Sequence, residues 1–321
     1  MEPVFVPNIE LNSLHKIPRI GFGTWLIKPE EVGNIIKTAV KCGYRHFDCG
    51  FIYGNQKEIG KAFKELFNEH VVKREELFIT SKVWNTFHSY KRALKNIDMI
   101  LDELGLDYLD LCLIHWPMGY KEGDELFPKV DNKILLSDID FTETWAALEK
   151  AVYNEKVRSI GLSNFNRKQI DRIVENCRIR PAVLQTEIHV YFQQNELISI
   201  CQSYGIQVIA SCPLASSKEN PFRKSDYPCV FTDPVITEIA NELGKTNAQV
   251  ALRYLIQKGL IVIPKSTNEE RMNENLRIIR FMLTDEHLAK LSRLDTRKRI
   301  IHLELSCHSP LYPWKVLNEV S

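Results

Sequence analysis

The sequence predicts an α/β protein, a single (β/α)8 TIM barrel that spans residues 1–321. Eight short apolar runs alternate with segments of helical period, and no linker, repeat or low-complexity stretch divides the chain. A further apolar alternation at residues 4–17 precedes the first run and predicts a hairpin that closes the floor of the barrel. An open doubly wound sheet fits less well, because it usually has fewer strand–helix alternations.

Each predicted strand is a short apolar run that reads as a buried parallel strand. The runs are RIGFG (19–23), RHFDC (45–49), LFITSK (77–82), YLDLCLIH (108–115), VRSIGLS (157–163), AVLQTE (182–187), QVIASC (207–212) and LIVIP (260–264). The stretches between them, such as PEEVGNIIKTAVKC and TETWAALEKAVYNEK, carry apolar residues at helical spacing and predict the outer helices.

Composition excludes several function classes. With 42 basic and 41 acidic residues the net charge is +1, which favours neither nucleic acid nor an anionic membrane as a partner. The N-terminal stretch MEPVFVPNIELN does not resemble a signal peptide, and no apolar run approaches the ~20 residues of a membrane span. The eight cysteines are scattered without a C-x-x-C pair, which predicts reduced thiols in a cytoplasmic protein.

Polar groups able to handle protons follow three consecutive predicted strands. Asp48, Lys82 and His115 fall at the ends of the second, third and fourth strands, and Tyr53 lies in the loop after the second. In a TIM barrel the chemistry sits at the carboxyl ends of the strands. The sequence therefore predicts that these four side chains converge on one rim.

The four residue types suit proton transfer to a carbonyl oxygen. A free tyrosine has a pKa near ~10, and a nearby ammonium such as Lys82 lowers it by stabilising the phenolate. A buried Lys82 would need a carboxylate partner, which Asp48 could be, and a neutral His115 could position the carbonyl oxygen. Any one of these residues alone is more often structural, but their joint placement favours a catalytic role.

Three motifs extend this reading. GYRHFDCGFIYGNQKEIG (43–60), VRSIGLSNFN (157–166) and IPKSTNEERMNEN (263–275) resemble, in order, the motifs of the aldo-keto reductases. The resemblance covers roughly residues 5–316 and is nearest to the animal aldose and aldehyde reductases. The catalytic tetrad of that family falls on Asp48, Tyr53, Lys82 and His115, with Gly50 where Ala or Ser is usual.

The resemblance implies NADPH-dependent reduction of aldehydes and ketones by a monomer. Hydride would come from the nicotinamide and the proton from Tyr53, which Lys82 and Asp48 would tune while His115 orients the substrate oxygen. Family members that reduce steroid carbon–carbon double bonds carry Glu in place of His115, so His favours a carbonyl acceptor. The alternative is a non-catalytic dinucleotide-binding member with a structural, crystallin-like or regulatory role, which the intact tetrad disfavours.

The resemblance also implies the residues that bind NADPH or NADP⁺. These are Thr24, Asp48, Ser163, Asn164, Gln185, Ser211, Leu214, Lys265, Ser266, Asn268, Arg271, Glu274 and Asn275. Lys265 and Arg271 would hold the 2′-phosphate, although Thr267 and Glu270 also predict a capping box that explains some of the polar residues. The stretch GFGTWL (21–26) only mimics a dinucleotide fingerprint, because Leu26 replaces its third glycine.

The implied substrate cleft is apolar and selects hydrophobic carbonyl compounds. Its residues would be Trp25, Phe51, Ile52, Trp84, His115, Trp116, Phe127, Phe222 and Glu304, with a plain core role as the alternative for each aromatic ring. The C-terminal specificity segment departs from the family at His302 and Glu304. Ser211 stands where relatives stack an aromatic ring on the nicotinamide, unless a shift of one residue places Cys212 there. No metal is expected, and His189 is predicted to be structural or exposed.

Overall fold

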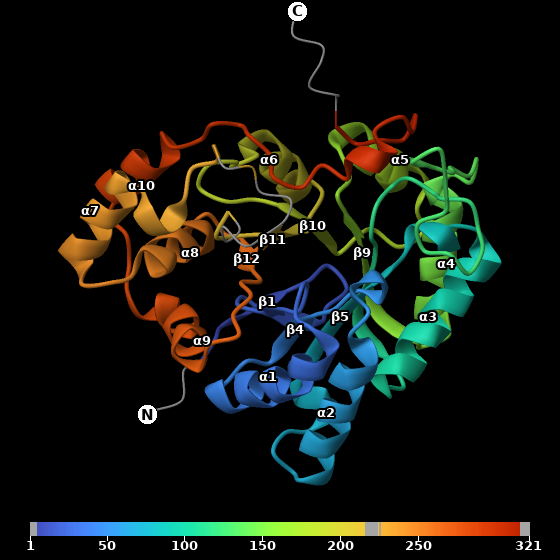
Figure 1. Cartoon of the computed structure of the whole chain (residues 1–321), viewed down its shortest axis with the longest axis horizontal. Coiled ribbons are helices and arrows are strands. Elements are labelled where there is room, and N and C mark those ends of the chain that lie inside the picture. Colours follow the sequence, from blue (N-terminus) through green and yellow to red (C-terminus); the bar gives the residue numbers. More distant parts are fainter. Residues whose placement is uncertain (1–4, 216–223, 225, 315–321) are drawn as a thin grey trace, which may run out of the picture.

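The computed structural model describes residues 5–215, 224 and 226–314. A curled sheet of eight parallel strands forms its centre (Figure 1). In spatial order the strands are β3 (Phe22–Gly23), β4 (His46–Asp48), β5 (Phe78–Val83), β6 (Leu109–Ile114), β9 (Val157–Ser163), β10 (Val183–Glu187), β11 (Gln207–Ser211) and β12 (Ile261–Val262). Each lies within, or within one residue of, a run that the sequence predicts, so the eight-strand prediction is confirmed.

The first and last strands close the sheet into a barrel. Ile20 bridges Val262 in parallel, and the Gly21 N–H donates to the Val262 carbonyl at 2.8 Å. The Gly23 N–H donates to the Pro264 carbonyl at 3.2 Å, and a Cβ on Gly23 would lie 2.9 Å from the Ile263 carbonyl oxygen. Glycine at this position therefore allows the close backbone approach that the seam requires.

Within the described residues, ten α-helices surround the sheet (Figure 1). They are α1 (Pro29–Cys42), α2 (Gln56–Asn68), α3 (Tyr90–Leu104), α4 (Phe141–Tyr153), α5 (Arg167–Asn176), α6 (Asn195–Ser203), α7 (Pro234–Leu243), α8 (Asn247–Gln257), α9 (Glu269–Leu276) and α10 (Asp285–Ser292). Helix α1 begins with Pro29 and ends at Cys42. The next residue, Gly43, has a φ of 112°, and its N–H caps carbonyls of the last turn. None of the described helices is long and apolar enough to cross a membrane.

The predicted N-terminal hairpin is present. β1 (Asn8–Glu10) pairs antiparallel with β2 (Lys16–Pro18), and Ile9 stands opposite Ile17. Leu11 and Ile17 are buried and pack with Leu111, Val183 and other apolar residues that point into the barrel. The hairpin thus removes apolar side chains from water by covering the amino-terminal end of the barrel, its floor.

The opposite end of the barrel, which the carboxyl ends of the strands form, is the rim, and shorter elements complete the loops at both the rim and the floor. Besides the small hairpin β7 (Lys129–Val130) and β8 (Lys133–Ile134), these are the 3₁₀ turns η1 (Phe51–Tyr53), η2 (Arg74–Glu76), η3 (Asn85–Phe87), η4 (Val230–Thr232), η5 (Arg277–Arg280) and η6 (Glu304–Ser306). Residues 293–314, the C-terminal segment, leave α10 and run past α6 toward α5 (Figure 1).

Candidate active site

Local structure brings the four predicted proton-handling groups to one rim. Asp48 ends β4, Lys82 lies near the end of β5, and His115 directly follows β6. The turn η1 carries Tyr53 back over the sheet, and a Cβ on Gly50 would lie 2.9 Å from the Tyr53 ring. The phenol therefore packs directly against the backbone of Gly50, and a side chain at this position would require the Tyr53 ring to shift.

Lys82 is the centre of a compact hydrogen-bonded group. Its side chain is fully buried, and Nζ lies 2.9 and 2.8 Å from the two carboxylate oxygens of Asp48. The same ammonium donates to the Cys49 carbonyl at 2.7 Å and to the Tyr53 hydroxyl at 3.1 Å. Gln185 Nε2 donates to Asp48 Oδ1 at 2.6 Å. The buried charges are thus paired and hydrogen-bonded, as burial demands.

Two opposing effects set the acidity of Tyr53. The charge of Lys82 acts to lower the pKa of Tyr53, as the sequence predicts, but burial is the larger effect and raises this pKa to about 12. Desolvation of the phenolate thus outweighs its attraction to the ammonium. Burial acts to lower the pKa of Lys82, but Asp48 holds it above the usual value. At neutral pH the phenol keeps its proton and the ammonium its charge.

His115 completes the group as a neutral imidazole. Its ring centroid lies 5.8 Å from that of Tyr53 in an edge-on arrangement. Burial, and next the charge of Lys82, hold the pKa of His115 well below its usual value. Asn164 fixes the backbone here by donating from Nδ2 to the His115 carbonyl at 3.1 Å. A neutral imidazole can donate one hydrogen bond to an incoming oxygen, as the sequence predicts.

A cavity of about 300 Å³ opens above Tyr53 and Asp48. Its lining consists of Gly23, Trp25, Leu26, Asp48, Tyr53, Gln185, Ser211, Cys212, Pro213, Leu214, Phe231, Ile263, Pro264 and Lys265. Seven of these residues are predicted cofactor, catalytic or substrate residues: Trp25, Asp48, Tyr53, Gln185, Ser211, Leu214 and Lys265. The structure therefore gathers contributions from strands at both sides of the barrel seam into one site.

Of the other lining residues, only Cys212 is predicted from the sequence, as the alternative to Ser211. Cys212 and Pro213 follow β11, and Ile263 and Pro264 follow β12, so their place just after a strand end could have identified them. Leu26 and Phe231 have exposed fractions of 49% and 47%, and nothing in the sequence marks Phe231. Their exposure beside the cavity adds two large apolar groups to its mouth.

The remaining predicted cofactor residues fall into two groups outside this lining. Thr24 Oγ1 donates to the Asp48 carbonyl at 2.8 Å, while Ser163 ends β9 and is followed by Asn164, which has a positive φ of 61°. Ser266, Asn268, Arg271, Glu274 and Asn275 lie between Lys265 and the end of α9.

The start of α9 corrects one prediction. Asn268, and not Thr267, is the N-cap, because its side chain accepts the Arg271 N–H at 2.9 Å. The predicted capping box of Thr267 with Glu270 is therefore wrong. Both Thr and Asn are good N-cap residues, and the structure begins the helix one residue later than the pattern suggests.

Two of the predicted substrate residues, Trp84 and Phe127, form an aromatic group beside His115. The Trp84 ring lies 5.3 Å from His115 and 5.2 Å from Phe127, and Trp84 Nε1 donates to the Leu126 carbonyl at 2.8 Å. Phe51, Trp84 and Trp116 are buried, Ile52 and Phe127 are partly buried, and Glu304 is exposed at the start of η6. Phe222 lies outside the described residues.

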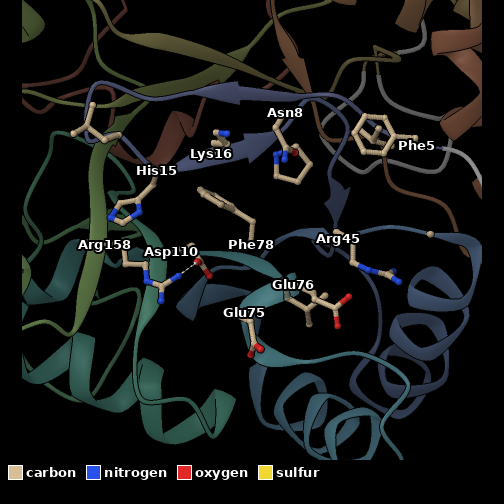
Figure 2. A pocket seen from close by; sticks show the side chains of 15 residues that line it. Phe5, Asn8, His15, Lys16, Arg45, Glu75, Glu76, Phe78, Asp110 and Arg158 are labelled. Carbon is tan, nitrogen blue, oxygen red and sulfur yellow. Dashed lines mark hydrogen bonds and ion pairs between the residues drawn. The ribbon is translucent and has the colours of Figure 1, made fainter.

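A second and larger cavity, about 680 Å³, lies at the floor of the barrel (Figure 2). Figure 2 shows Phe78 at its centre, with Arg158 reaching Asp110 at one side. Asp110 Oδ2 accepts from Arg74 at 2.7 Å and from the Ile79 N–H at 2.9 Å. The sequence predicts no functional residue here.

The described residues include no group of three His, Cys, Asp or Glu side chains that could hold a metal ion. His189 is fully buried, and its Nε2 lies 3.0 Å from Glu187 Oε1. Of the two roles predicted for His189, structural or at the surface, burial excludes the second.

Comparisons with known proteins agree with one another. Residues 19–296 match the model of the Aldo/keto reductase family. The chain is 41% identical over 315 residues to "Aldo-keto reductase family 1 member A1" of Homo sapiens, covering 95% of this chain and 97% of that protein. The Xenopus tropicalis protein of the same name is 40% identical over 298 residues, 91% of each chain. The solved aldose reductase from Schistosoma japonicum matches with a TM-score of 0.90 and 42% identity, covering 98% of this chain and 99% of that one.

Proposed function

The chain belongs to the aldo/keto reductase family, and from that premise we propose that it reduces apolar or aromatic aldehydes and ketones to alcohols with NADPH. One observation carries the proposal. The Lys82 ammonium binds both the Asp48 carboxylate and the Tyr53 hydroxyl, and Tyr53 lines a cavity. A phenol that is partly buried, protonated and bound to an ammonium is suited to give a proton to a developing alkoxide.

The residues of the rim divide the work of the reaction. Bound NADPH supplies the hydride, and the proton leaves Tyr53 Oη for the carbonyl oxygen. The phenolate that remains lies 3.1 Å from Lys82 Nζ, which compensates its charge. Asp48 keeps Lys82 charged and in place, and neutral His115 donates the hydrogen bond that orients the carbonyl oxygen.

The chemistry of the lining fits a dinucleotide phosphate. We assign the nicotinamide amide to Ser163, Asn164 and Gln185, which surround the carboxyl ends of β9 and β10. Lys265 lines the cavity, and Arg271 lies in the first turn of α9, so the two cations suit the 2′-phosphate. Their companions in cofactor binding would be Thr24, Asp48, Ser211, Leu214, Ser266, Asn268, Glu274 and Asn275.

The aromatic group beside His115 favours a hydrophobic carbonyl compound. Trp84 contacts His115 directly, and the neighbouring Trp25, Phe51, Ile52, Trp116 and Phe127 offer few polar partners to a substrate. Glu304 is the exception and would meet the outer end of a long substrate. One chain supplies all four groups, so we expect a monomer. The eight cysteines are all described and form no disulfide, which suits the reducing cytoplasm.

Tyr53→Phe tests the function and separates it from a non-catalytic, cofactor-binding role. The variant should lose about 10²–10⁴-fold in NADPH-dependent reduction, the usual contribution of a general acid, while its affinity for NADPH stays nearly unchanged. The measurement is NADPH oxidation against a panel of aromatic aldehydes, sugars, quinones and ketosteroids.

Two results would contradict the proposal. A loss under about tenfold would remove Tyr53 as the proton donor. A wild-type protein that binds NADPH and oxidises it with no member of the panel would favour the structural or regulatory alternative.

A further inference from the structure

The C-terminal segment is tied to the barrel by one buried carboxylate. We propose that Glu187 is a positioning residue for substrate selection: it fixes residues 299–301 so that the rest of the C-terminal segment forms a wall of the carbonyl site. The inference rests on the proposed function. It concerns which carbonyl compounds fit, and not how the proton or hydride is transferred.

Glu187 ends β10 and is 1% exposed. Its Oε1 accepts the Ile300 N–H at 2.7 Å, and its Oε2 accepts the Ile301 N–H at 2.8 Å. His189 Nε2 lies 3.0 Å from Oε1 on the same strand-end loop. Burial would raise the pKa of Glu187, but the hydrogen bond with His189 and the charge of Arg299 lower it below its usual value. Charge-assisted bonds of this kind are among the stronger hydrogen bonds in proteins.

Arg299 adds a second tie at the same place. Its guanidinium lies 4.5 Å from the centre of the Phe192 ring and 3.5 Å from that of Trp314, with an exposed fraction of 7%. Burial lowers the pKa of Arg299 to about 10, and the charge of Glu187 opposes this change. The Tyr227 hydroxyl also donates to the Arg299 carbonyl. The N–H groups of the next two residues therefore bind one carboxylate, and Trp314 brings the far end of the segment back to the same point.

Beyond these anchors the segment reaches the aromatic group of the carbonyl site. The Ser306 hydroxyl is hydrogen-bonded to the Tyr120 hydroxyl, and the Tyr120 ring lies 5.8 Å from Trp84. Trp84 in turn contacts His115 at 5.3 Å. A displacement at residues 299–301 would therefore move Glu304 and Ser306 relative to Trp84. This displacement would weaken the binding of a large substrate that contacts the segment. It would not affect a small aldehyde that only the four rim groups hold.

Weaker contacts hold the two ends of the segment. Thr296 donates from both N and Oγ1 to the Tyr191 carbonyl at 3.0 Å. Gln169 Nε2 donates to the Leu311 carbonyl at 2.8 Å, and Asn166 Nδ2 donates to the Pro313 carbonyl at 3.1 Å. None of these neutral bonds involves the N–H groups of Ile300 and Ile301, which donate to Glu187 alone among the described residues.

Glu187→Gln tests the inference with two probes, propanal and naphthaldehyde. The variant keeps the shape of the side chain but loses its charge. We expect the KM for naphthaldehyde to rise about tenfold or more, with kcat/KM for propanal and the Kd for NADPH within about threefold of wild type. Asp110→Asn is the matched control, because Asp110 is also a buried carboxylate that accepts a backbone N–H, at the opposite end of the barrel. Asp110→Asn should change neither the KM for naphthaldehyde nor the kcat/KM for propanal.

Each other result decides against the inference. An equal loss for both aldehydes, or an unchanged KM for naphthaldehyde in a folded variant, overturns it. If Glu187→Gln does not fold, Glu187→Asp, which keeps the charge but shortens the side chain so that it no longer reaches both N–H groups, must show the same split. A folded Glu187→Asp without the split overturns the inference as well. A wild-type protein inactive with both aldehydes would refute the proposed function before any variant is compared.

Discussion

The rim and the floor of the barrel each hold a buried aspartate that is paired with cationic side chains, but the groups around the two aspartates differ. At the rim, Asp48 binds Lys82, and Lys82 also binds the hydroxyl of Tyr53. At the floor, Asp110 binds Arg74 and Arg158 and accepts a backbone N–H. The rim cavity measures about 300 Å³ and the floor cavity about 680 Å³.

The difference shows that neither cavity volume nor buried charge alone marks an active site. The Arg74 and Arg158 guanidinia both stack on Tyr108, at 3.9 and 3.8 Å from its ring centre. Among the described residues, their hydrogen bonds go to carbonyl and carboxylate oxygens and to no hydroxyl, so the floor group holds the loops together. At the rim a titratable phenol touches the ammonium, so charge and proton can move together.

The largest expected contrast between the two ends is in stability. Lys82→Met leaves the Asp48 carboxylate buried without its cation, which should cost about 3–5 kcal/mol of unfolding free energy and also cripple turnover. Arg158→Met removes a cation whose side chain is 40% exposed, and should cost about 0–1 kcal/mol. Urea unfolding of both variants measures the contrast. Equal losses of unfolding free energy in the two variants would mean that Asp48 and Asp110 depend equally on these cations.

Acid should affect both ends in the same way. Burial lowers the pKa of His46, on the floor side of β4, to about 4, and likewise that of His88, after η3. Between pH 6.5 and about 4 these histidines bind protons in the unfolded chain but not in the folded chain. The free energy of unfolding therefore falls as the pH falls. The loss per histidine is on the order of 1 kcal/mol for each pH unit.

The matched variant for this acid effect is His88→Leu. Neither ring nitrogen of His88 has a hydrogen-bond partner among the described residues, so the replacement breaks no such bond. Unfolding free energies from pH 7 to pH 4.5 should show the wild type losing stability relative to the variant. Parallel curves would show that His88 does protonate in the folded protein.

Cofactor choice should depend on the rim alone. Arg271→Ala should weaken NADPH by roughly tenfold to a hundredfold, since a charged hydrogen bond contributes about 1.5–3 kcal/mol, and should leave NADH nearly unchanged. Arg45→Ala is the control at the floor, where Arg45 lines the larger cavity. Fluorescence titration with both cofactors measures the difference. Equal losses of affinity for NADPH and NADH in Arg271→Ala would show that Arg271 acts through the fold. A loss of NADPH affinity in Arg45→Ala would place the cofactor at the floor and contradict its assignment to the rim.

The smallest expected effect lies within the rim. Ser211→Tyr adds a ring at the end of β11, and ring stacking contributes about 0.5–1.5 kcal/mol beyond area burial, so NADP⁺ should bind several-fold more tightly. If product release limits turnover, kcat should fall at the same time. Titration of wild type and variant with NADP⁺ gives the answer. Unchanged or weaker binding would show that another group, such as neighbouring Cys212, covers this face.

The strand pattern and the four rim groups were predictable from sequence for one reason. Strands buried on both faces read as apolar runs, and a polar residue at the carboxyl end of such a run must face the rim. Asp48, Lys82 and His115 follow this rule directly. Tyr53 needed the glycines on either side of its turn, Gly50 and Gly54, as a further signal.

Other features depend on contacts that local sequence does not encode. The pKa of Tyr53 depends on how deeply a loop residue is buried, which is set by the packing around it. Glu187 accepts the N–H of Ile300, more than a hundred residues later in the chain, and no local sequence pattern predicts that hydrogen bond. Thr267 and Asn268 are adjacent residues of equal capping ability, so only the backbone conformation could choose between them.

The seam of the barrel has a consequence for how the chain folds during synthesis. β3 finds one neighbour, β4, within the first fifty residues, but its other edge pairs with Val262 and Pro264 near the end of the barrel. Until the ribosome has released that last strand, the sheet keeps two open edges able to pair with foreign strands. Closing so distant a contact is slow. The nascent protein therefore stays vulnerable to aggregation over most of its translation, and a chaperone that shields the edge of β3 would be most useful in that interval.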